Sequence, residues 1–71
     1  MKEVLVTIII PIYNVEKYLR MTLNSVQAQT LKNLEVIMID DGSTDGSSEI
    51  AQQYAQNDKR FQYYYQSNRG L

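Results

Sequence analysis

Three short polar segments of this chain carry the side chains whose chemistry could serve a ligand, at residues 11–14, 40–45 and 67–70. Together they supply an aromatic ring, several carboxylates and a guanidinium, which suit base stacking, hydrogen bonding to base N–H groups and phosphate contact. The 71 residues include no Cys and no His. This excludes thiolate nucleophiles, Ser-His-Asp relays and Cys/His zinc sites, so any chemistry rests on carboxylates, hydroxyls, amides, Arg or Lys.

The first segment places Tyr13 directly after an apolar run. A tyrosine at a strand end can stack on a flat base, and it can equally close the top of a core, so both roles stay open. The segment has no glycine, and neither G-x-G-x-x-G nor G-x-x-x-x-G-K-S/T occurs in the chain. A pyrophosphate cradle of the dinucleotide-binding or P-loop type is therefore not expected there.

Two adjacent carboxylates, Asp40 and Asp41, open the second segment. Successive side chains of extended backbone point to opposite sides, so these two are not a pair that shares one proton. We expect Asp41 to face a ligand, where it can accept a hydrogen bond from a base N–H or a ribose hydroxyl. Asp45, followed by Gly46, is expected to be a turn or cap residue. In the third segment, Arg69 can meet a phosphate or lie in solvent, and both roles stay open.

Apolar patterns on either side of these segments predict three strands. Residues 4–10 and 34–39 are nearly continuous apolar runs, typical of strands buried on both faces of a parallel sheet. Pro11 is expected to end the first strand. Residues 61–65 alternate well enough for a third strand, and its tyrosines are expected to pack in the core rather than to stack on bases.

Two amphipathic helices are predicted between the strands. Apolar residues at positions 19, 23 and 26 mark the first, with Asn14 as its N-cap, and those at 50, 51, 54 and 55 mark the second, capped by Thr44 or Asp45. The β-α-β-α-β order predicts an α/β fold with parallel strands joined by right-handed crossovers, the first half of a doubly wound sheet. Ligands bind such sheets at the carboxyl ends of the strands, where all three polar segments fall.

Composition and charge exclude several other classes of protein. Seven Lys and Arg against eight Asp and Glu leave a net charge of −1, without the basic excess that a nucleic-acid surface needs. The longest apolar run, residues 4–12, is far shorter than the roughly 20 residues of a membrane span, and no signal-peptide pattern is present. We predict a cytoplasmic chain with no transmembrane segment and no nucleic-acid partner, and the inner face of a membrane stays open as an alternative.

Four stretches of the chain closely resemble the beginning of family 2 glycosyltransferases, in the same order and with matching spacing. They are TIIIPIYN at residues 7–14, SVQAQT at 25–30, LEVIMIDDGSTD at 34–45 and NRGL at 68–71. The resemblance implies a three-layer, Rossmann-like β-α-β-α-β half of a GT-A nucleotide-diphospho-sugar transferase fold with a parallel sheet. It also implies transfer of a sugar from a nucleotide-diphosphate donor, a UDP-sugar, to a hydroxyl acceptor on a glycan or a lipid-linked molecule.

The same resemblance assigns roles to individual residues. It implies that Tyr13 stacks on the nucleobase, usually uracil, and that Asp41 accepts a hydrogen bond from the base imide. The other members of the implied nucleotide-binding set shape the first loop, support the second loop or lie near the phosphates: Pro11 and Asn14, Asp40, and Arg69, respectively.

Two features that the family carries further along its chains are not found in residues 1–71. Family members hold Mg or Mn against the diphosphate with an acidic D-x-D-like motif, and a later Asp is the base for the acceptor hydroxyl. We expect residues 1–71 to be the N-terminal nucleotide-binding portion of a glycosyltransferase domain, a fragment without the metal motif and the acceptor half. Such a fragment binds no metal itself and is not catalytic alone.

Apart from the family resemblance, the residues are compatible with two other functions. A non-catalytic α/β module could self-associate through an exposed aromatic sheet edge at residues 61–65. A receiver-like, Mg-binding domain could use Asp40 and Asp41, but a later phospho-acceptor Asp and a Lys/Thr switch set do not follow in the expected order.

Overall fold

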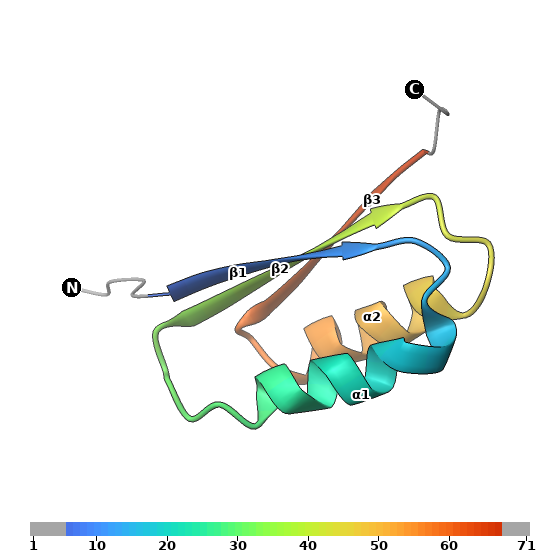
Figure 1. Ribbon diagram of the computed structural model, residues 1–71. Coiled ribbons are helices and arrows are strands. Elements are labelled where there is room, and N and C mark those ends of the chain that lie inside the picture. Colours follow the sequence, from blue (N-terminus) through green and yellow to red (C-terminus); the bar gives the residue numbers. More distant parts are fainter. Residues whose placement is uncertain (1–5, 68–71) are drawn as a thin grey trace.

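Three strands and two helices alternate along the part of the chain that the computed structural model describes, residues 6–67 (Figure 1). Their bounds are β1 Val6–Ile12, α1 Glu16–Gln27, β2 Leu34–Asp41, α2 Ser47–Asn57 and β3 Phe61–Gln66. The strands are parallel and lie in the order β1-β2-β3. The predicted α/β class and β-α-β-α-β order are confirmed. Neither helix within this range has the length and apolar character needed to cross a membrane.

Both helices lie on one face of the sheet (Figure 1). Right-handed crossovers between strands that are neighbours in chain order place every helix on the same side. The described residues therefore supply two layers, and they leave the other face of the sheet, called the outer face below, uncovered. Its side chains are Thr7, Ile9 and Pro11 of β1, Glu35, Ile37, Ile39 and Asp41 of β2, and Gln62, Tyr64 and Gln66 of β3.

The prediction that the strands are buried on both faces is wrong for this part of the chain. Ile9, on the outer face of β1, is 62% exposed. On β2 burial alternates residue by residue, with Leu34, Val36 and Met38 buried against the helices. The apolar runs are continuous in sequence, but only one of the two faces that they form meets the helices of the described part.

The core between the sheet and the helices contains the stripes that the helix periodicity predicts. Their side chains are buried in it or packed against it: Leu19, Leu23 and Val26 from α1, and Ile50, Ala51, Tyr54 and Ala55 from α2. Ridges at this spacing lie on one side of a helix and remove apolar surface from water there. These predictions are confirmed.

The tyrosines of β3 divide between the core and the solvent. Phe61 is buried and Tyr63 packs against the core. Tyr64 and Tyr65 are 53% and 59% exposed, so the prediction of core packing is wrong for these two. Tyr64 points to the outer face, where its hydroxyl donates to Gln62 Oε1 at 2.7 Å.

The first strand continues through Pro11 to Ile12 instead of ending at the proline. Proline has no N–H to donate and is found in sheets mainly on edge strands. In the described sheet β1 is an edge strand, paired only with β2. One side of β1 therefore has no strand to bond with, and Pro11 is accommodated.

Arg60, in the turn before β3, caps the far end of α1. Its guanidinium donates to the backbone carbonyls of Gln27, Gln29 and Leu31 at 3.1, 2.7 and 3.0 Å. It also pairs with Asp58, Nη2 to Oδ2 at 2.9 Å, and this partner holds the pKa of Asp58 below its ordinary value. Carbonyls at a helix C-terminus lack partners within the helix, so Arg60 satisfies groups that α1 cannot.

Candidate functional site

A groove of about 490 Å³ lies on the outer face at the carboxyl ends of the strands. This volume is within the range typical of small-molecule sites. The residues of its lining that bear on function are Ile9, Pro11, Tyr13, Ile39, Asp41 and Gln66. The groove combines mostly apolar walls with a few converging polar groups, at the sheet edge where the topology predicts ligand binding.

Tyr13 and Asp41, two of the predicted site residues, both line this groove. Tyr13 is 50% exposed, so its ring does not close the core and remains available to a ligand. Asp41 is the last residue of β2, and Gly42 after it has a φ of 78°, a left-handed conformation that glycine adopts without steric cost. The backbone can therefore turn away directly after Asp41, which leaves the carboxylate at the edge of the groove.

Asp40 lies on the opposite face, between the sheet and the helices, where it is fully buried. Its Oδ1 accepts the backbone N–H of Ser43 at 2.9 Å, and its Oδ2 accepts the hydroxyls of Tyr63 at 2.6 Å and of Ser48. Burial by itself raises the pKa of Asp40, but the hydrogen bonds from Ser48, Tyr63 and Ser43 outweigh burial and leave the pKa below its ordinary value. Asp40 thus holds the loop that follows β2 in place and does not line the groove.

Asn14 joins the loop after β1 to the loop after β2. Its φ is 50°, a left-handed conformation that Asn adopts more readily than most residues. Its Oδ1 accepts the backbone N–H groups of Thr44 at 2.8 Å and Asp45 at 3.3 Å. The prediction that Asn14 caps α1 is wrong, because the N-cap is Val15, whose N–H donates to Ser47 Oγ at 2.9 Å.

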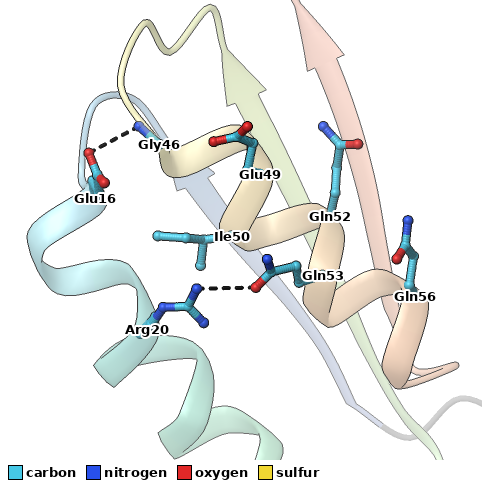
Figure 2. A pocket seen from close by; sticks show the side chains of 8 residues that line it. All are labelled: Glu16, Arg20, Gly46, Glu49, Ile50, Gln52, Gln53 and Gln56. Atoms are coloured by element: carbon cyan, nitrogen blue, oxygen red, sulfur yellow. Dashed lines mark hydrogen bonds between the residues drawn. The ribbon is translucent and has the colours of Figure 1, made fainter.

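The helices cap each other across these loops. The N–H of Glu16, at the start of α1, donates to Asp45 Oδ2 at 3.2 Å, and Glu16 Oε1 accepts the N–H of Gly46 at 3.0 Å (Figure 2). The N-cap of α2 is Gly46, not Thr44 or Asp45 as expected. Asp45 nevertheless accepts the N–H of Ser47 at 2.9 Å, and hydrogen bonds from Ser47 lower the pKa of Asp45. The exposed N–H groups at both helix starts are therefore satisfied from the other loop as well as locally.

A second hollow, of about 610 Å³, lies between α1 and α2 (Figure 2). Its polar side chains bridge the two helices: Arg20 Nη2 donates to Gln53 Oε1 at 3.1 Å, next to the bond between Glu16 and Gly46. Its lining includes no aromatic ring on which a base could stack. We therefore place the ligand site in the groove on the outer face, although the hollow is larger.

The structure brings together only part of the predicted site. Pro11, Tyr13 and Asp41 share the groove. Asn14 and Asp40 act on the loops behind it. Arg69 lies outside the described residues.

Gln66 is a groove residue that the sequence reasoning missed. It is the direct partner of Asp41 in the β2–β3 register, and its Nε2 donates to Asp41 Oδ1 at 3.3 Å. The alternation of residues 61–66 contains a signal, since it puts Gln66 on the opposite side of the strand from Phe61. Recognising it requires the strand order and the register as well.

The acidic side chains of residues 6–67 do not form a metal centre. No group of three or more of them gathers where it could hold an ion. Asp40 and Asp41 lie on opposite faces of the sheet, and Asp40 already accepts hydrogen bonds from three protein donors. This donor set does not fit Mg or Mn, so no chemical step is assigned to a metal held by these residues.

Comparisons with known proteins agree with one another. The family model described as glycosyl transferase family 2 matches residues 7–71. The chain is 48% identical over 66 residues to glycosyltransferase GlyA of Streptococcus pneumoniae serotype 4 (strain ATCC BAA-334 / TIGR4), an alignment that covers 93% of this chain and 10% of GlyA. It is 45% identical over 67 residues to glycosyltransferase EpsJ of Bacillus subtilis (strain 168), covering 94% of this chain and 20% of EpsJ. The chain thus spans a tenth to a fifth of the length of these relatives.

Proposed function

Since the chain belongs to glycosyl transferase family 2, we propose that it supplies the nucleotide-binding part of an enzyme that transfers a sugar from a nucleotide-diphosphate donor to a hydroxyl acceptor. The observation that supports this role is the groove in which Tyr13 and Asp41 lie together at the carboxyl ends of the strands. The proposed acceptor is a glycan or a lipid-linked molecule. Mg or Mn would be held against the diphosphate by residues outside 6–67.

The proposed donor is a UDP-sugar, and each groove residue has a distinct task. The exposed ring of Tyr13 offers a flat surface for a base, a contact worth about 1–3 kcal/mol in single-strand binding proteins. The carboxylate of Asp41 can accept only, which suits the imide N–H of uracil. Pro11 and Ile39 line the apolar wall beside them. A base held this way leaves its ribose and phosphates free to extend past the carboxyl ends of the strands.

Titration of UDP into ¹⁵N-labelled protein tests this proposal. We expect amide shifts centred on Tyr13 and Asp41, with saturation at millimolar nucleotide, and Arg69 is expected to respond if it lies near the phosphates. Asp41→Ala removes a hydrogen bond to a charged group and should weaken UDP binding by about 10- to 100-fold. The matched control is Glu35→Ala, because Glu35 is a carboxylate on the same strand and the same outer face but at its other end.

Two results would contradict nucleotide binding in the groove. One is the absence of amide shifts on addition of UDP to a folded sample, and the other is an equal loss of UDP affinity in Asp41→Ala and Glu35→Ala. The same sample should not turn over a UDP-sugar, because residues 6–67 offer neither a metal centre nor a base placed beside the groove other than Asp41, which is used for the nucleotide. Measurable sugar transfer by this chain would show that the proposal of a nucleotide-binding part without catalytic activity is wrong.

Self-association through the sheet is the second candidate function. Ile9 and Tyr64 are 62% and 53% exposed on the outer face, and each strand next to β2 leaves an unpaired edge in the described sheet. Static light scattering separates the candidates. A monomer that binds UDP supports the nucleotide role, whereas an oligomer indifferent to UDP supports the association role.

A further inference from the structure

Gln66 lies beside Asp41 and can therefore affect which base the groove binds. The two residues are direct partners across β2 and β3, and Gln66 Nε2 donates to Asp41 Oδ1 at 3.3 Å. A carboxylate accepts but does not donate, so the amide group must turn its N–H side toward Asp41. Both residues line the groove that contains Tyr13.

The pair presents an acceptor and a donor next to each other. The Gln66 amide has two N–H groups, and the bond to Oδ1 uses one of them. Within residues 6–67, no hydrogen bond reaches the other carboxylate oxygen, Oδ2 of Asp41. The groove can therefore offer Oδ2 to a base N–H while the second N–H of Gln66 is offered to a neighbouring base carbonyl.

This arrangement suits some base edges better than others. Uracil presents an N–H between two carbonyls and matches the acceptor and the donor together, and the N1–H and O6 of guanine can meet the same two groups. Cytosine presents an unprotonated ring nitrogen, which a carboxylate repels. Guanine presents an N–H between a carbonyl and an amino group, and a carboxylate with both oxygens free would accept from both donors. Because Gln66 occupies Oδ1, the guanine amino group is left without that acceptor.

We propose that Gln66 is a specificity-determining residue: by occupying one oxygen of Asp41 it makes the groove select uracil over guanine, whose amino group is left without an acceptor, while its second N–H donates to the base carbonyl and the Asp41 carboxylate excludes cytosine. This inference rests on the proposed nucleotide-binding function and deepens it. It assigns the choice of base to a pair of residues, whereas Asp41 alone would accept an imide N–H from either uracil or guanine.

The test compares the dissociation constants of UDP, GDP and CDP for the wild-type chain, Gln66→Leu and Gln62→Leu. Gln62 is the matched control, because it lies on the same strand and face and its Nε2 likewise donates to a β2 carboxylate, Glu35 Oε2 at 3.0 Å. We expect the wild type to bind UDP about tenfold more tightly than GDP. Gln66→Leu should weaken UDP binding about 3- to 10-fold and bring the UDP-to-GDP ratio close to one, while Gln62→Leu keeps the wild-type ratio.

The outcomes separate this inference from the function on which it rests. If Gln66→Leu weakens all three nucleotides equally, or changes none of them, Gln66 does not determine specificity, although loss of UDP binding in Asp41→Ala still supports the nucleotide site. If the wild-type chain binds no nucleotide, both proposals are wrong. Gln66 is exposed, so the variant is expected to keep the wild-type urea midpoint, which confirms that a changed ratio comes from the groove.

Discussion

Replacing Asp40 with alanine is expected to lower the free energy of unfolding by about 3 kcal/mol. The carboxylate is fully buried and accepts hydrogen bonds from Ser43, Ser48 and Tyr63. Alanine leaves all three donors, which are partly buried, without their acceptor. A core of this size supplies about 3–5 kcal/mol, so the variant should lose most of its stability. Urea unfolding at pH 7, followed by circular dichroism, measures the change.

The neighbouring variant Asp41→Ala is the control for this prediction. Asp41 is partly exposed on the outer face, and its side chain bonds only to Gln66 within the described part. We expect Asp41→Ala to unfold at nearly the wild-type urea concentration although it binds UDP about 10- to 100-fold more weakly. Equal urea midpoints for the two variants would show that the buried network around Asp40 does not stabilise the fold.

The same buried carboxylate makes the stability depend on pH. The folded-state pKa of Asp40 lies below the unfolded value of about 3.9, so its stabilising effect is fully present above that value and is lost as pH falls through the folded pKa. The urea midpoint should change little above about pH 5 and fall below about pH 4. Asp45 and Asp58, whose pKa values are also lowered, contribute to the same fall. In Asp40→Asn, the decrease of the urea midpoint at low pH should therefore be smaller than in the wild type but still present. An unchanged decrease would contradict this account.

Arg60→Ala is expected to lower the urea midpoint strongly, although Arg60 lies in a turn. The guanidinium bonds to the carbonyl of the last residue of α1, to two carbonyls of the connector after it and to Asp58, so its loss frees the helix end and the start of β3 at once. Arg60→Lys should recover little, because an ammonium group has three donors on a single atom and cannot span the same acceptors. Urea unfolding at pH 7 measures both variants.

Lys59→Ala provides the control for Arg60, since Lys59 is an exposed cation in the same turn. It should unfold at the wild-type urea concentration. If Lys59→Ala and Arg60→Ala shift the midpoint equally, the effect arises from the loss of positive charge in the turn and not from capping of α1.

The elements of this fold follow from sequence pattern because each uses local information. Leu19 and Leu23 repeat at helical spacing, and the adjacent positions of Asp40 and Asp41 place their side chains on opposite faces. The exposure of Ile9 could not be predicted in the same way. An apolar run shows that a strand can be buried on two faces, but whether both faces are covered depends on elements elsewhere in the chain.

The site residues at the ends of predicted strands could be predicted from the sequence. Those that depend on the register between strands could not. Tyr13 and Asp41 follow two apolar runs, so parallel topology alone brings them to one edge. Gln66 joins them only because β3 pairs with β2 at a specific register. The cap assignments of Asn14 and Thr44 failed for a related reason, since capping was sought within one loop and the partners lie about 30 positions away in the chain.

The hydrogen bonds between the loop after β1 and the loop after β2 limit how the lengths of these loops can change. Asn14 Oδ1 accepts the Thr44 N–H at 2.8 Å, and in the opposite direction the Glu16 N–H donates to Asp45 Oδ2 at 3.2 Å. An insertion in either loop would move these donors away from their acceptors unless the other loop changed in length as well. Among chains with these linked loops, differences in ligand specificity are therefore expected to come from substitutions at the strand ends, while the lengths of the two loops stay the same.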